Sequence, residues 1–102
     1  MGMLTFEVAH QLPRDEARKR VEKLTDHWAS KYGVVTQWSG DSATVAGKVM
    51  GMKVDARITV AEGKVGGEAT DPGFLFRNKA RDYLTYKFTQ ALEPGGSGNL
   101  QD

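Results

Sequence analysis

The sequence contains no cysteine among its 102 residues. This absence excludes disulfide bonds, zinc sites built on thiolates and a cysteine nucleophile, and it fits a reducing compartment. No apolar run approaches the roughly 18 residues that a membrane-spanning helix needs. The stretch 1–20 also lacks the basic segment and apolar core of a signal peptide. We therefore expect a cytoplasmic protein with no transmembrane segment.

The sequence also has no large excess of positive or of negative charge. The chain carries 14 Lys and Arg against 13 Asp and Glu, a formal net charge of +1. The basic residues of the stretch 14–23 are interleaved with acidic residues four positions away, which is typical of an exposed, self-paired helix. We therefore expect no nucleic-acid partner. The length suits a single α+β domain over 1–93, followed by a flexible glycine- and serine-containing tail over 94–102.

Recognisable catalytic patterns are also missing. His10 and His27 have no partner at a metal-ligand spacing, and no serine lies in a nucleophile elbow. Asp55 and Glu68 are expected on the solvated side of a sheet, where no apolar pocket raises the pKa of a carboxyl group. We therefore expect no catalytic residue, no metal ligand and no cofactor. The sequence favours a binding or accessory protein over an enzyme.

The first part of the chain predicts a strand and then a helix. Apolar and polar residues alternate from Leu4 to His10, which is the period of a half-buried strand. Pro13 suits the first position of a helix, and Gly33 suits the left-handed residue that ends one. Between them an apolar stripe at spacings of three and four contains Ala17, Val21, Leu24, Trp28 and Tyr32.

Three tight turns, at 40–41, 50–51 and 62–63, predict a meander of four strands. Each turn independently fixes the register of one hairpin, and all three registers place the apolar residues on the same face. The predicted pairs are Trp38 with Ala43, Thr36 with Val45, Val45 with Ala56, Ala43 with Ile58, Gly47 with Val54, Val49 with Met52, Ile58 with Gly67, and Val60 with Val65. The other face is almost wholly polar and should contact water.

The last predicted element is a helix that Asp71 caps, that Pro72 opens and that ends near Leu92. Its apolar stripe contains Phe76, Ala80, Tyr83, Leu84, Phe88 and Ala91. The predicted fold is α+β in the order β-α-β-β-β-β-α, with a mostly antiparallel sheet and both helices on its apolar face. This order is compatible with a helix-grip arrangement, in which the last helix lies across a curved sheet. The first strand could lie beside the second or beside the fifth.

Small residues line the middle of the apolar face: Ala43, Gly47, Ala56, Gly67 and Ala69. Bulky side chains must lie over them, and close packing by helix aromatics is the usual outcome. The alternative is an incompletely filled groove that admits an acyl or hydroxyacyl chain. The candidate groove residues are Trp28, Trp38, Ala56, Gly67, Tyr83 and Phe88.

An apolar segment at the entrance of the last helix is a second candidate site. Phe74 and Leu75 fall off the helix stripe and flank Phe76. Exposed together, these three residues would contact a hydrophobic surface or partner. A hydrophobic staple or a dimer contact would explain them equally well.

With these elements placed, the chain resembles the polyhydroxyalkanoic acid system, or granule-region, family of small bacterial proteins. The resemblance follows the order of short features over about 4–92: His10, the series Glu16, Ala17, Arg18, Val21 and Leu24, the helix end at Tyr32 and Gly33, the turn at Trp38, Gly40 and Asp41, the Gly51 turn, and Phe74 to Phe76. It implies a granule-linked or regulatory accessory of polyhydroxyalkanoate storage. It implies no catalytic residue.

Three hypotheses follow. The first is a non-enzymatic accessory of polyhydroxyalkanoate metabolism that contacts the granule surface or granule proteins in the cytoplasm. The second is a small carrier or sensor that holds a hydrophobic ligand between helix and sheet. The third is a homodimeric interaction module without a ligand.

Overall fold

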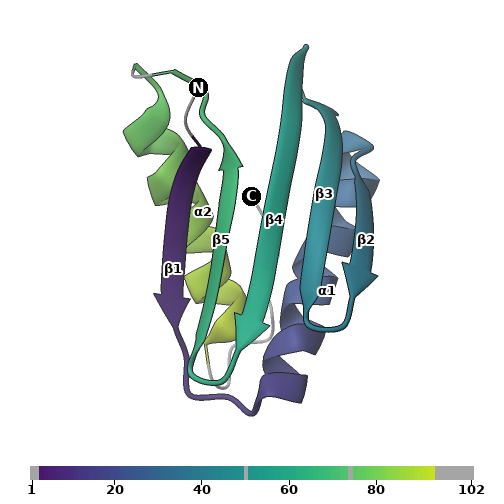
Figure 1. The fold of residues 1–102 in the computed structure, drawn as a ribbon, viewed down its shortest axis with the longest axis vertical. Helices are drawn as coiled ribbons and strands as arrows, with labels where there is room; N and C mark the ends of the chain where they lie inside the picture. The colour runs from purple at the N-terminus through teal and green to yellow at the C-terminus, as the bar shows by residue number, and fades with distance from the viewer. Residues whose placement is uncertain (1–2, 50, 74, 94–102) are drawn as a thin grey trace.

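The structure, a computed structural model that describes residues 3–49, 51–73 and 75–93, contains one five-stranded antiparallel sheet with two helices on one face (Figure 1). This is the α+β order predicted from the sequence. The elements are β1 (Met3–Ala9), α1 (Arg14–Tyr32), β2 (Val35–Ser39), β3 (Ser42–Val49), β4 (Met52–Ala61), β5 (Lys64–Thr70) and α2 (Arg77–Leu92).

The strand order across the sheet is β1-β5-β4-β3-β2. The first strand therefore lies beside the fifth, with Met3 opposite Thr70 and Ala9 opposite Lys64. This settles the position that the sequence left open. Because β1 forms one edge, the Arg81 guanidinium of α2 can reach it, and its Nε donates a hydrogen bond to the Thr5 carbonyl at 3.1 Å.

All predicted hairpin registers are confirmed, including Val45 opposite Ala56 and Val60 opposite Val65. The turn glycines Gly40, Gly51 and Gly63 have φ values of 61°, 81° and 82°, a conformation that glycine adopts without steric cost. The apolar positions of the five strands consequently share the face that the helices cover.

The first helix follows the predicted pattern closely. It begins at Arg14, directly after Pro13, and ends at Tyr32. Gly33 follows with a φ of 76°, and its N–H donates to the Ala29 carbonyl at 2.9 Å. The predicted stripe from Ala17 to Trp28 is buried against the sheet. Within the described ranges, neither helix is long and apolar enough to cross a membrane.

The start of the second helix was predicted wrongly. It begins at Arg77 and not at Pro72, because Asp71 organises a turn instead of capping a helix. Its Oδ1 accepts a hydrogen bond from the Gly73 N–H at 2.8 Å, and its Oδ2 pairs with the Arg77 Nε at 2.7 Å. Gly73 has a φ of 101°, outside the helical region. Phe76 therefore precedes the helix and is 58% exposed, so it does not belong to the buried stripe.

The two helices meet at the C-terminal end of α2 and diverge toward the opposite end of the sheet, like the arms of a V (Figure 1). At the closed end the Arg20 Nη1 donates hydrogen bonds to the carbonyls of Ala91 at 3.3 Å and Glu93 at 2.8 Å. The Phe88 ring stacks on Phe6 with centroids 4.9 Å apart and meets the edge of Trp28 at 5.7 Å. These contacts join both helices to β1.

Gly67 is the most tightly constrained of the small residues. A Cβ at this position would lie 2.6 Å from the Arg57 carbonyl oxygen and 2.7 Å from Cζ of Phe6. Both distances are shorter than van der Waals contact permits, and the Arg57 oxygen belongs to the backbone of the neighbouring strand. Glycine is therefore required here for the Phe6 ring to lie on β5.

We predict that Gly67→Ala destabilises the protein by about 1–3 kcal/mol, the usual cost of an overpacked core. The matched control is Gly66→Ala, whose new Cβ would meet no atom closer than 3.5 Å. Urea unfolding of both variants measures the difference. Equal stabilities of the two variants would contradict the close fit of Phe6 on Gly67.

Candidate functional site, an apolar pocket between the helices and the sheet

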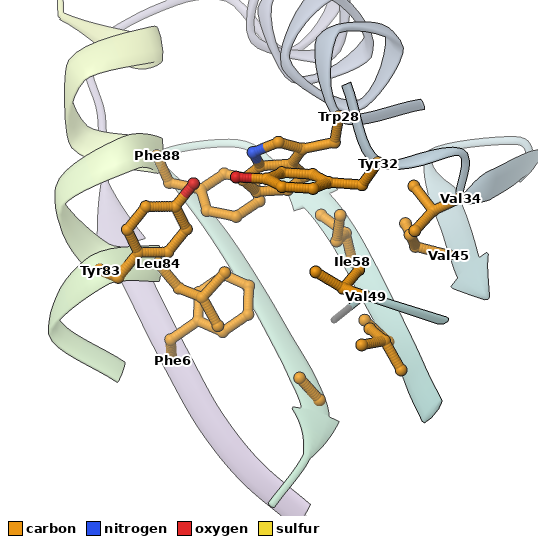
Figure 2. A pocket seen from close by; sticks show the side chains of 13 residues that line it. Phe6, Trp28, Tyr32, Val34, Val45, Val49, Ile58, Tyr83, Leu84 and Phe88 are labelled. Carbon is orange, nitrogen blue, oxygen red and sulfur yellow. The ribbon is translucent and has the colours of Figure 1, made fainter. Parts of the chain in front are cut away.

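A pocket of about 240 Å³ lies where the two helices diverge above the sheet (Figure 2). Helix α1 contributes Trp28 and Tyr32, and α2 contributes Tyr83, Leu84 and Phe88. The remaining lining residues are Phe6, Val34, Val45, Val49, Val54, Ala56, Ile58 and Ala69. No side chain in this set carries a charge, so the pocket can offer a ligand apolar contact and a few neutral hydrogen bonds.

The pocket lies over two of the small residues on the sheet. Ala56 and Ala69 lie opposite each other on β4 and β5, and both line the pocket. By contrast, Phe6 covers Gly67, and Val34 packs so closely on Gly47 that a Cβ there would lie 3.0 Å from it. The close packing expected over the whole face therefore covers only part of it.

Four of the six candidate groove residues line this pocket, namely Trp28, Ala56, Tyr83 and Phe88. The other two do not. The Phe6 ring occupies the space above Gly67, and Trp38 lies near the far edge of the sheet, where the Arg18 guanidinium covers its ring at 4.3 Å. Phe6 also lines the pocket and was not predicted to do so, although it lies in the inward phase of β1.

Three polar atoms lie on the side of this apolar pocket that the helices form, where Tyr83 is 40% exposed, and we call this side the mouth. Figure 2 shows the indole nitrogen of Trp28 and the hydroxyl groups of Tyr32 and Tyr83 pointing toward one another. Burial raises the pKa of the Tyr83 hydroxyl, hydrogen bonding with Trp28 lowers this pKa, and Tyr32 raises it further. The net shift is upward, so Tyr83 remains a neutral hydroxyl group at physiological pH.

The apolar segment at the entrance of α2 is exposed where it is described. Leu75 is 73% exposed and Phe76 is 58% exposed, while Phe74 lies outside the described residues. The segment follows β5 at the end of the sheet where β4 begins with Met52, which is 48% exposed. This is the end toward which the helices diverge (Figure 1).

His10 has a structural role in the fold. It is 8% exposed, its Nε2 lies 3.0 Å from the Ala61 carbonyl oxygen, and its Nδ1 accepts the Leu12 N–H at 3.1 Å. A neutral ring protonated on Nε2 satisfies both contacts. His10 thus ties the connection between β1 and α1 to the end of β4, and neither histidine lines the pocket.

Two arginines of α1 contact other groups of the protein. Arg18 and Arg20 form the predicted i,i+4 pairs with Glu22 at 3.4 Å and Glu16 at 3.2 Å. The Arg18 Nε also donates to the Gly40 carbonyl at 3.1 Å, which holds the β2–β3 turn against the helix. These guanidinium groups therefore stabilise the fold at a distance from the pocket.

Comparison with known proteins identifies a family. The model of the family described as "Putative polyhydroxyalkanoic acid system protein" matches residues 4–93. The match extends from β1 to the end of α2 and thus includes every element that lines the pocket. No curated protein matches the chain.

The raised pKa of Tyr83 predicts an alkaline component in the tyrosine absorbance titration, above the ordinary value of about 10. Tyr83→Phe should remove this component, whereas Tyr86→Phe, a change at a ring that is 60% exposed, should leave it in place. The unfolded chain should ionise first, because its Tyr83 pKa is the ordinary one. The free energy of unfolding should therefore be unaffected below about pH 10 and fall above it, less so in Tyr83→Phe. A titration in which Tyr83→Phe retains the alkaline component would contradict the prediction.

Proposed function

The chain belongs to the polyhydroxyalkanoic acid system family, and on that premise we propose that it is a non-enzymatic accessory protein of polyhydroxyalkanoate storage. It binds an acyl or hydroxyacyl chain in the pocket between its helices and its sheet. The observation that carries this proposal is the pocket itself, with its uncharged lining of aliphatic and aromatic side chains. Such a lining suits the hydrocarbon part of a hydroxyalkanoate.

The size of the pocket limits the length of the chain. An apolar cavity of about 150 Å³ accepts benzene, with its six carbon atoms. On that scale the 240 Å³ pocket accommodates on the order of ten carbon atoms. Each buried methylene contributes about 0.8 kcal/mol of transfer free energy, so a chain of this length gains enough to offset part of the cost of association.

The exposed segment at Leu75 and Phe76 supports contact with the apolar surface of a storage granule. Both side chains lie at the open end of the V formed by the helices, next to the end of the sheet where Val54 lines the pocket. A protein that contacts the granule through this end would present its pocket to acyl chains there. This arrangement favours a granule-bound accessory in the cytoplasm over a freely diffusing carrier of the same ligand.

We predict that Ala56→Leu weakens the binding of methyl 3-hydroxyoctanoate at least about tenfold, because the larger side chain occupies the pocket. The matched control is Ala46→Leu, the same change on the exposed face of the neighbouring strand, which should bind as the parent does. Binding can be followed through Trp28 fluorescence in a Trp38→Phe background, since only Trp28 lines the pocket. Undiminished binding by Ala56→Leu would contradict the proposal that the ligand binds in this pocket.

We predict that Leu75→Ser combined with Phe76→Ser releases the protein from isolated polyhydroxybutyrate granules in a co-sedimentation assay. Burial of two large apolar side chains contributes several kcal/mol to surface binding, and serine removes it. The control is Val35→Ser, because Val35 is 59% exposed but lies on the opposite edge of the sheet. Circular dichroism should be unchanged in both variants. Persistent sedimentation of the double variant would argue against this contact.

A further inference from the structure

We propose that Trp28, Tyr32 and Tyr83 recognise the uncharged carbonyl oxygen of an ester or thioester at the mouth of the pocket, and thereby select acyl esters over free carboxylates and over plain hydrocarbon chains. This inference rests on the proposed function, because it assigns the polar end of the chain that the pocket binds. Its basis is the convergence of three neutral polar groups at the mouth of a pocket whose lining is otherwise apolar (Figure 2).

The three groups have more donor hydrogens than acceptor oxygens. The Trp28 indole N–H is a donor only, and each tyrosine hydroxyl has one hydrogen to donate and one oxygen that accepts. When each of the two oxygens accepts one hydrogen bond, one of the three hydrogens remains as a donor for a ligand.

Hydrogen-bonding groups that lie together polarise one another, which strengthens the donor that a ligand meets. The site is partly shielded from water, since Trp28 is 8% exposed and Tyr83 is 40% exposed. A ligand without an acceptor would leave the remaining donor unsatisfied when it covers these groups, which carries a desolvation cost. A carbonyl oxygen meets this requirement.

The charge of the site favours a neutral acceptor. No lining side chain is ionised, and transfer of a carboxylate into such surroundings without a paired cation is strongly unfavourable. The ammonium groups of Lys31 and Lys87 lie over the rings of Tyr32 and Tyr83, at 5.4 Å and 5.8 Å from the centroids. Neither lysine lines the pocket. The polar groups that a ligand meets there are the neutral ones of Trp28, Tyr32 and Tyr83.

This assignment also orients the ligand. The carbonyl lies between the C-terminal end of α1 and the middle of α2, where Tyr32 and Tyr83 are placed. The hydrocarbon part extends over Ala56 and Ala69, the two small residues on the floor of the pocket. An acyl ester bound in this way keeps its alkoxy or thiol part outside, so the same geometry accepts a polymer segment or a small ester.

The test compares three probes of one chain length by isothermal titration calorimetry: methyl octanoate, octanoate and 1-chlorooctane. The proteins are the parent, Tyr32→Phe, Tyr83→Phe and the control Tyr86→Phe, whose ring lies outside the pocket. One neutral hydrogen bond contributes about 0.5–1.5 kcal/mol, which corresponds to a change in affinity of about two- to tenfold.

We expect the parent and Tyr86→Phe to bind methyl octanoate about two- to tenfold more tightly than 1-chlorooctane, and at least about tenfold more tightly than octanoate. Tyr32→Phe and Tyr83→Phe should lose the preference for the ester over 1-chlorooctane while 1-chlorooctane binds as before. Loss of the preference in these variants alone would identify the hydroxyl groups as its source.

Two results would overturn the inference and leave the proposed function standing. One is equal binding of the ester and 1-chlorooctane by the parent, with no effect of either phenylalanine variant. The other is tighter binding of octanoate than of its ester. If none of the three chains binds to the parent, the proposed function itself is contradicted.

Discussion

The register of the antiparallel sheet is the constraint on which the rest of the structure depends. A slip of one residue in any hairpin would turn that strand's apolar side chains toward water. The glycine turns prevent such a slip, and they bring Val45, Ile58 and Val65 onto one face. Because only this face is apolar, both helices must cover it, and their packing decides whether any space remains.

Two helices cannot cover a five-stranded sheet completely when they meet at one end and diverge at the other. The rings of Phe6, Trp28 and Phe88 pack together where the helices meet. From there toward the start of α2, the distance between the helices grows (Figure 1). Bulky residues on the sheet could have filled the gap, but Ala56 and Ala69 lie there. The pocket thus results from small side chains beneath divergent helices, and the tyrosine hydroxyls at its mouth give it a polar end.

Local patterns in the sequence were sufficient to predict the element order, the hairpin registers and the buried stripe of α1, because these depend on periodicity and turn chemistry. The start of α2 depends on the side-chain contacts of Asp71 with Gly73 and Arg77, and a capping pattern alone does not distinguish a turn from a helix. The small residues indicated where a groove could form. Which of them Phe6 would cover depends on the pairing of β1 with β5, a long-range contact that periodicity does not reveal.

The family match and the pocket are two separate observations about the protein. The match relates the chain to polyhydroxyalkanoate systems, and the pocket supplies a physical means by which an accessory protein could engage the acyl part of that material. The most direct measurement is isotope-edited NMR of the protein with methyl 3-hydroxyoctanoate. We predict nuclear Overhauser effects from the ligand chain to the methyl groups of Ala56 and Ala69, which line the pocket. Effects confined to residues of the polar face of the sheet, such as Ala46, or no intermolecular effects at all, would contradict it.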